Sequence, residues 1–286
     1  MFKRFLLSSL FTLLVFNGYA QPKVGIVLSG GGALGFAHIG ALQALEEAGI
    51  HPTYVAGSSM GALVGAFYAS GMTPKEIFDM VRAEKIYSIS KIFSLSVSTE
   101  KIGISSHKNV NKLMDKYIPH NSFDLLPKHL YVSAVNLNTQ KCEIVGKGNK
   151  LKEYVLASSS IAAVFEAIEI NGDIYVDGGS LNNMPTEAIR EKCDVVIGID
   201  AVPPYEENDI NNIKDVSLRL LNIITCANSV AGRKMCDFLV ESFAVKYYTI
   251  FDFEKYEEIY NYGYSAMSSY INEHPEMIDK CSGKNK

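Results

Sequence analysis

The chain has 286 residues, 48% of them hydrophobic and 20% charged, which is typical of a globular protein with a sizeable core. A formal net charge of −4 gives no basic surface for nucleic acid, so we expect no nucleic-acid partner. The five cysteines show no CxxC metal signature, and we interpret them as ordinary small residues while leaving open a pair between Cys226 and Cys236.

Residues 1–20 have the pattern of a secretory signal peptide. The pair Lys3-Arg4 is positive, residues 5–16 are apolar but too few to span a bilayer comfortably, and small residues occupy the −3 and −1 positions before Gln21. We therefore predict cleavage before Gln21 and export to the periplasm, the cell envelope or the medium, with residues 21–286 as one mature domain. An uncleaved N-terminal anchor is the alternative that the same pattern allows.

Two strand–turn–helix units open the mature chain. An apolar run over 23–29 predicts a buried strand, the glycine loop 30–35 predicts a turn, and a helix is expected over 36–48. A second β-prone run over 53–56 leads into a helix of small residues over 60–69. Both units therefore place a glycine-rich turn between the end of a strand and the start of a helix.

Strands and helices continue to alternate along the chain, which predicts an α/β sandwich around a largely parallel sheet. Residues 86–106 alternate apolar residues with serine and fit either a strand or a flap. The core is expected to end near 271, and the tail 282–286 is expected to be disordered. The further predicted elements are helices starting at Pro74 and over 109–117, 151–157, 186–191, 216–243 and 255–271, and strands over 130–136, 142–145, 168–170, 174–176, 195–199 and 247–250.

The turn after the second strand contains the pattern Gly-x-Ser-x-Gly, formed by Gly57, Ser59 and Gly61. Strand, sharp turn and helix are the context of a nucleophile elbow, in which the serine stands exposed at a strained turn. A plain glycine-rich turn is the alternative. We expect Ser59 to be a nucleophile whose hydroxyl lies near a helix N-terminus, where backbone N–H groups favour negative charge.

The first glycine loop, Gly30 to Gly35, matches the G-x-G-x-x-G fingerprint of dinucleotide-binding proteins. That fingerprint requires an acidic residue at the end of the second strand, where this chain carries the Ser59 elbow instead. We therefore favour an oxyanion hole over a nucleotide cradle. Its expected donors are the backbone N–H groups of Gly30, Gly31, Gly32 and Met60.

The residue that accepts the serine proton has two candidates. Among the six histidines only His274 follows the likely acid in the chain order of an α/β-hydrolase triad, and it lies beyond the last predicted helix. Asp177 ends a predicted strand and is followed by Gly178 and Gly179, which leaves open backbone around its carboxylate. A plain Asp-Gly turn would have the same local pattern.

Three stretches together resemble the patatin-like phospholipase family. They are Gly30-Gly31-Gly32-Ala33-Leu34-Gly35, Gly57-Ser58-Ser59-Met60-Gly61 and Asp177-Gly178-Gly179, supported by Ala157-Ser158-Ser159-Ser160-Ile161 and Asn182-Asn183-Met184-Pro185. The resemblance covers residues 23–271. It implies a three-layer α/β/α sandwich and a lipid acyl hydrolase that uses a Ser59–Asp177 dyad without histidine, metal or cofactor.

The chain departs from the family's pattern at three positions. Leu34 stands where relatives commonly have Arg or Lys, while Ala162 and Glu166 stand where prolines are frequent. We expect a looser turn before Asp177 and an influence of Glu166 on Asp177 if the two lie close. A lipid- or partner-binding envelope domain without catalysis is the alternative function.

Overall fold

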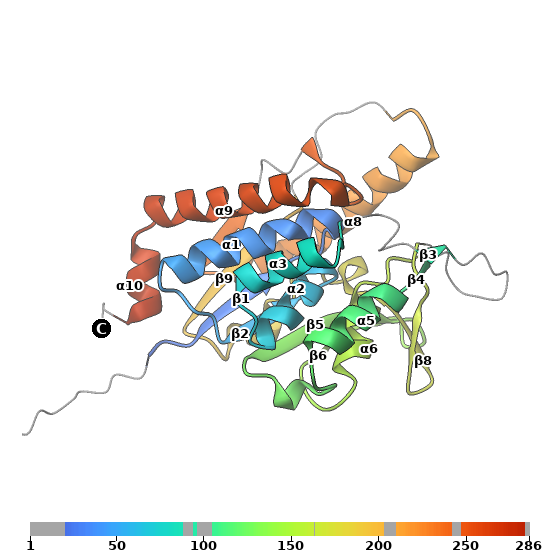
Figure 1. Ribbon diagram of the computed structural model, residues 1–286, viewed down its shortest axis with the longest axis horizontal. Helices are drawn as coiled ribbons and strands as arrows, with labels where there is room; N and C mark the ends of the chain where they lie inside the picture. Colours follow the sequence, from blue (N-terminus) through green and yellow to red (C-terminus); the bar gives the residue numbers. More distant parts are fainter. Residues whose placement is uncertain are drawn as a thin grey trace, which may run out of the picture.

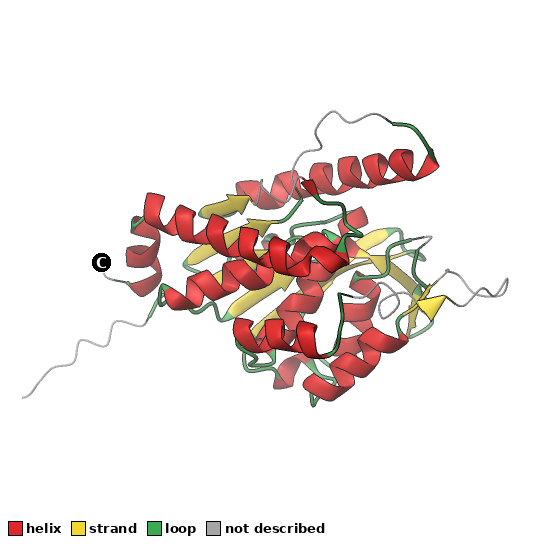
Figure 2. Ribbon diagram, turned by 45° about the horizontal axis from the view of Figure 1, so that its top comes forward, coloured by secondary structure: helices red, strands yellow, loops and turns green. Residues whose placement is uncertain are grey.

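The structure is a computed structural model that describes residues 21–87, 94–95, 105–162, 164–202, 210–241 and 247–283. In it, a mixed, mostly parallel sheet lies between two layers of helices (Figures 1 and 2). The predicted signal peptide falls outside the described residues. Within these ranges, no helix combines the length and the apolar character needed to cross a membrane.

The sheet runs in the order β10-β9-β1-β2-β5-β8-β7, and β6 pairs with β5. The first five strands in this order are parallel, whereas β6 and β8 are antiparallel to β5, and β7 is antiparallel to β8. The strands are β1 (Val24–Leu28), β2 (Tyr54–Gly57), β5 (His129–Asn136), β6 (Lys141–Val145), β7 (Ile168–Ile170), β8 (Asp173–Asp177), β9 (Val195–Asp200) and β10 (Phe238–Glu241).

Both faces of the central strands are buried, which explains the continuous apolar run of β1. Alternate residues of β1 point to opposite faces: Ile26 and Leu28 pack in the main core, and Val27 packs in a second cluster on the other side. The helices are α1 (Phe36–Glu47), α2 (Met60–Ala69), α3 (Pro74–Ala83), α5 (Lys108–Tyr117), α6 (Leu151–Ser158), α7 (Glu187–Arg190), α8 (Ile213–Lys234), α9 (Tyr256–Glu273) and α10 (Glu276–Ser282).

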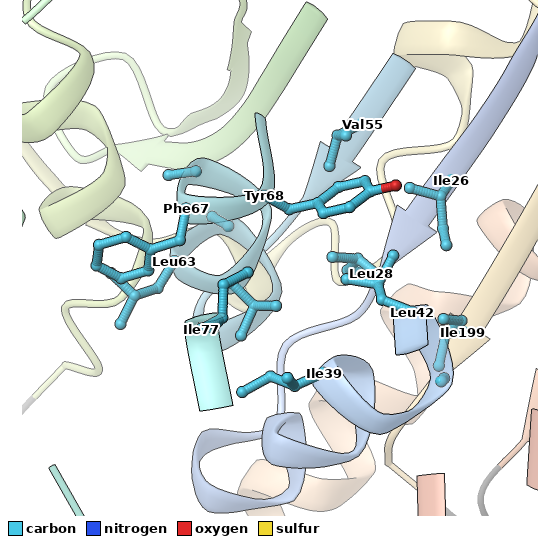
Figure 3. Packing of buried hydrophobic residues seen from close by; sticks show 14 of the residues in the cluster. Ile26, Leu28, Ile39, Leu42, Val55, Leu63, Phe67, Tyr68, Ile77 and Ile199 are labelled. Atoms are coloured by element: carbon cyan, nitrogen blue, oxygen red, sulfur yellow. The ribbon is translucent and has the colours of Figure 1, made fainter. Parts of the chain in front are cut away.

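The main core joins α1, α2, α3 and α9 to the sheet. In Figure 3 the side chain of Tyr68 on α2 lies beside Ile26 and Leu28 of β1 and Val55 of β2, whereas Leu63 and Phe67 lie on the other side of the same helix. Helix α9 runs along α1 (Figure 1) because each contributes a glycine where the two backbones meet. A Cβ at Gly263 would collide with the carbonyl of Ala37, so the glycines allow the close approach that buries the facing sides of the two helices.

The structure confirms most predicted elements to within a few residues. Helix α3 begins at Pro74 as predicted, and a capping box at Thr73 precedes it. The predicted helix over 216–243 is wrong: α8 ends at Lys234, and Phe238–Glu241 form the edge strand β10. The apolar run of β10 follows the helix so closely that local pattern does not separate them. Residues 247–250 form no strand. No disulfide joins any of the five cysteines, all of which lie in the described ranges, so the pair left open between Cys226 and Cys236 does not form.

The C-terminal end extends further than predicted. The unpredicted α10 carries Met277 into the main core, so the core reaches beyond residue 271, and Ser282 is helical. Residues 284–286 lie outside the described ranges. Most of 86–106, the expected strand or flap, lies outside them too, although the short strands β3 (Ser94–Leu95) and β4 (Ser105–Ser106) pair antiparallel.

Candidate active site

Ser59 occupies the sharp turn between β2 and α2. Its φ of 53° and ψ of −125° lie in a region that residues other than glycine rarely adopt, as a nucleophile elbow requires. Gly61 makes the turn possible, because a Cβ there would collide with the carbonyl oxygens that end β1. Gly57 likewise approaches the backbone of Gly61 too closely for a side chain. The motif glycines therefore fix the position of Ser59.

The register of β5 brings Asp177 to Ser59. Val132 of β5 pairs with Gly57 at the end of β2, and Ala134, two residues further on, pairs with Asp177 at the end of β8. Strand β6 pairs with both Val132 and Ala134 and therefore occupies the other edge of β5. Strands β2 and β8 thus share one edge of β5, along which they run in opposite directions. Their carboxyl ends meet there, although 118 residues separate Ser59 from Asp177.

Ser59 Oγ donates a hydrogen bond of 2.6 Å to Asp177 Oδ2, and both side chains are buried. Asp177 Oδ1 accepts the backbone N–H of Gly179 at 2.8 Å. Burial raises the pKa of Asp177 from its ordinary value of 3.8 to about 6, against the opposite effect of these two hydrogen bonds. The carboxylate is thus ionised near neutral pH and basic enough to accept the serine proton.

Two hydrogen bonds from α6 and the turn after it support the pair. Ser158 Oγ accepts the backbone N–H of Ser59 at 2.9 Å, and Ser160 accepts the backbone N–H of Asp177 at 3.0 Å. Both serines belong to a stretch that resembles the family, but the sequence pattern indicates no role for either of them. The stretch therefore holds Ser59 and Asp177 in place from one short segment.

The first glycine loop faces Ser59 but contributes fewer free donors than predicted. The N–H of Gly30 donates to Asn183 Oδ1 at 3.0 Å, so Gly30 is not an available oxyanion donor, and this part of the prediction is wrong. Gly31 and Gly32 have φ values of 154° and 55°. Within the described part of the chain, no acceptor bonds the N–H of Gly31, Gly32 or Met60. These three groups are therefore available to an oxyanion, as the prediction requires.

Asn183 is a site residue that the sequence did not single out. Its side chain is fully buried, and its Nδ2 donates to Ser229 Oγ on α8 at 3.0 Å while Oδ1 accepts from Gly30. Gly179 lies so close to Asn183 that a Cβ there would contact Oδ1. Asn183 therefore joins the glycine loop, the Asp177 turn and α8.

The remaining motif glycines also have steric reasons. A Cβ at Gly35 would collide with the side chain of Met60, and one at Gly178 would collide with Ser133. These contacts hold the loop against the elbow and the Asp177 turn against β5.

The histidines do not contact the dyad among the described hydrogen bonds. His274 caps the C-terminal end of α9, where Nδ1 lies 3.3 Å from Glu276, and α10 follows it rather than a free tail. His107 bonds Ser160 Oγ at 2.8 Å, and His38 bonds the carbonyl of Ser29 at 2.8 Å. Burial lowers the pKa of each of these two imidazoles to about 4, so both are neutral structural groups.

The three departures from the family pattern have clear positions. Leu34 is buried and lines the pocket with Ala162, which makes these walls apolar. Glu166 does not shift the pKa of Asp177, whose causes are burial, Ser59 and Gly179. It acts instead on His107, where its backbone and charge oppose the effect of burial.

Ser59 and Asp177 lie in a pocket of about 300 Å³ with mainly apolar walls. One wall is α8, another is the glycine loop, and residues 247–250 complete it. An apolar chamber with a few polar groups at one point suits an acyl chain held with its carbonyl at the dyad. The lining residues that argue for this are Leu34, Ile161, Val202, Leu218, Leu221 and Ile224.

Comparisons with known proteins agree with this geometry. A family model described as "Patatin-like phospholipase" matches residues 26–190. The chain is 26% identical over 276 residues to lysophospholipase NTE1 of Meyerozyma guilliermondii, covering 86% of this chain and 19% of that protein. It is also 26% identical over 269 residues to lysophospholipase NTE1 of Saccharomyces cerevisiae, covering 84% of this chain and 16% of that protein. It therefore spans about a fifth of the length of these relatives.

The fold has a counterpart among solved structures. The crystal structure of VipD from Legionella pneumophila matches with a TM-score of 0.57 and 17% sequence identity, covering 89% of this chain and 67% of that chain. At this identity the match supports the fold alone, and it supports nothing about substrate.

Proposed function

The chain belongs to the patatin-like phospholipase family, and from this premise we propose that it is a serine-dependent lipid acyl hydrolase of the phospholipase A or lysophospholipase type. The observation that carries the proposal is the 2.6 Å hydrogen bond from Ser59 Oγ to Asp177 Oδ2 inside an apolar pocket. A domain that only binds lipid has no need of a strained serine paired with a carboxylate of raised pKa.

In the first half-reaction Ser59 Oγ attacks the acyl carbonyl while its proton passes to Asp177 Oδ2. The carbonyl oxygen becomes an oxyanion, which the N–H groups of Gly31, Gly32 and Met60 stabilise. The first turn of α2 adds the positive end of its dipole. Asp177 then returns the proton to the leaving alkoxide as its bond to the acyl carbon breaks, which leaves an ester of Ser59.

In the second half-reaction water replaces the alcohol. Asp177 takes one proton of the water as its oxygen attacks the ester, and the same proton returns to Ser59 Oγ when the acid leaves. The same carboxylate accepts and returns a proton in each half, which its pKa of about 6 suits, because both protonation states are accessible near neutral pH.

The substrate class follows from the pocket and from the relatives. Apolar walls suit a fatty acyl chain, and the relatives compared above are named lysophospholipases. With Leu34 in place of a cation, the described pocket walls offer no Lys or Arg for a phosphate headgroup. We therefore propose that the acyl chain, rather than the headgroup, dominates recognition.

The experiment is covalent labelling followed by product analysis. A fluorophosphonate should label Ser59 alone, as read by peptide mass spectrometry, and Ser59→Ala should abolish both labelling and ester hydrolysis. Incubation with mixed phospholipids and triglycerides should release fatty acid only with the unmodified protein. Labelling at Ser58 instead, or full activity of Ser59→Ala, contradicts the proposed nucleophile.

We also propose that residues 1–20 direct export and are removed before Gln21, on the strength of the positive and apolar pattern described above. N-terminal sequencing of protein from its native host tests this. A mature N-terminus at or next to Gln21 supports export with cleavage, and an intact Met1 in the cell-envelope fraction supports an anchor.

A further inference from the structure

Helix α8 presents an apolar face to solvent. Its exposed side chains recur with alternating spacings of three and four, as on one stripe of a helix. Ile213 is 83% exposed, and Leu220 and Ile223 are 55% and 56% exposed. The members of this outer stripe are Ile213, Val216, Leu220, Ile223, Ala227 and Val230.

The outer stripe lacks the charges that normally cover a surface helix. Between Val216 and Ala231 the only charged residue is Arg219, which is half-buried. At 1.5 Å per residue the stripe runs for roughly 25 Å. A continuous exposed apolar surface of this length marks an interaction site rather than ordinary surface.

The inner side of the same helix forms a wall of the active-site pocket. Leu218, Leu221 and Ile224 line the pocket that contains Ser59, so α8 alone separates this part of the chamber from the outer stripe. In Figure 1 the N-terminal part of α8 extends away from the rest of the helical layers. The helix thus carries pocket wall on one side and exposed apolar surface on the other.

Two further exposed apolar side chains lie next to this helix and pocket. Tyr247 lines the pocket and is 73% exposed. Leu181 is exposed and directly follows Ser180, whose carbonyl accepts a hydrogen bond of 2.7 Å from Asn228 on α8. The exposed apolar surface therefore continues from α8 to the rim of the pocket.

We propose that the outer stripe of α8 docks onto a neutral lipid–water interface and brings the pocket to its substrate; the inference rests on the proposed function. An apolar helix face lies flat in such an interface with its side chains among the acyl chains. The absence of charge on the stripe and the net charge of −4 favour zwitterionic over anionic lipid. Alternating spacings of three and four also suit pairing with a second copy of the helix, which the experiment distinguishes.

The experiment measures binding to phosphatidylcholine vesicles by flotation, using the full chain with Ser59→Ala so that lipid is not consumed. Adding Leu220→Glu and Ile223→Glu should lower the partition coefficient at least roughly tenfold, because two apolar side chains no longer leave water. Leu125→Glu, which replaces an equally exposed leucine outside α8, should bind like its parent.

Four outcomes are informative. Loss of vesicle binding in the α8 variant, with hydrolysis of a soluble short-chain ester unchanged when Ser59 is intact, supports docking. Unchanged vesicle binding overturns it, and so does sedimentation of the parent as a dimer that the same substitutions make monomeric. Failure of the unmodified protein to hydrolyse the soluble ester contradicts the proposed function, while the binding result is read independently.

Discussion

Asn183 Oδ1 accepts the backbone N–H of Gly30 at 3.0 Å, which ties the oxyanion loop to the segment after Asp177 across 153 residues of sequence. Because this bond orients Gly31 and Gly32, Asn183 acts as a positioning residue and not as a catalytic one. The same side chain reaches Ser229 on α8. The buried side-chain amide of Asn183 therefore connects the glycine loop, the turn after Asp177 and the pocket wall formed by α8.

Asn183→Leu should lower kcat by roughly tenfold to a hundredfold and change KM little, because displaced donors are felt mainly in the transition state. Ser229→Ala is the matched control: it removes the partner of Asn183 Nδ2 but keeps the bond to Gly30. Its kcat should stay within a few-fold of the unmodified protein. Steady-state kinetics on a soluble ester and a thermal melt measure both. Equal losses of kcat in the two variants would show that Asn183 only stabilises the fold.

Ser158→Ala should lower stability by about 1–3 kcal/mol and reduce turnover, since it leaves the buried N–H of Ser59 without its acceptor. Ser159→Ala provides the comparison, because within the described ranges its hydroxyl bonds only the carbonyls of Val155 and Leu156 in α6. Chemical denaturation and ester hydrolysis measure the two effects. A Ser158→Ala protein as stable and active as Ser159→Ala would exclude the positioning role.

Asp177→Asn should stabilise the protein at neutral pH. The pKa of Asp177 rises from 3.8 to about 6 on folding, so its protonated form is favoured in the folded state. The contribution of protonated Asp177 to the free energy of unfolding is fully present below pH 3.8. It is lost as the pH rises through about 6, and the loss is on the order of a few kcal/mol. An uncharged amide does not suffer this loss.

Melting temperatures of Asp177→Asn and the unmodified protein at pH 4 and pH 8 check the sign. The variant should melt higher at pH 8, and the difference should shrink at pH 4. A difference that grows at low pH would mean that the folded state favours the ionised carboxylate.

The sequence predicts the site residues whose position depends on one segment of the chain. It does not predict the residues that position them from other elements. The strand–turn–helix pattern with Gly57 and Gly61 predicts Ser59, because that turn is set by steric demands within one segment. Local pattern indicates no role for Asn183 or Ser158, because their partners come from other elements across the sheet. For the same reason it counts the N–H of Gly30 as a free donor, whereas this N–H donates to Asn183 Oδ1.

The fold shows the same division. Apolar periodicity predicts β1, α1 and α2 within a residue or two, since each has its own pattern and turn signals. It fails at β10, where an edge strand follows α8 after three residues and its apolar residues continue the helical pattern. Pairing with β9, a tertiary contact, makes Phe238–Glu241 a strand.

The most direct test of the Ser59–Asp177 dyad compares Asp177→Asn with His274→Ala in steady-state hydrolysis of one soluble ester across pH. Asp177→Asn should lose turnover by roughly a hundredfold to ten-thousandfold, because the amide cannot accept the serine proton. His274→Ala should remain near the unmodified rate, whose acid limb should fall as the pH drops through about 6. A large loss of turnover in His274→Ala, together with nearly unchanged turnover in Asp177→Asn, would contradict the dyad.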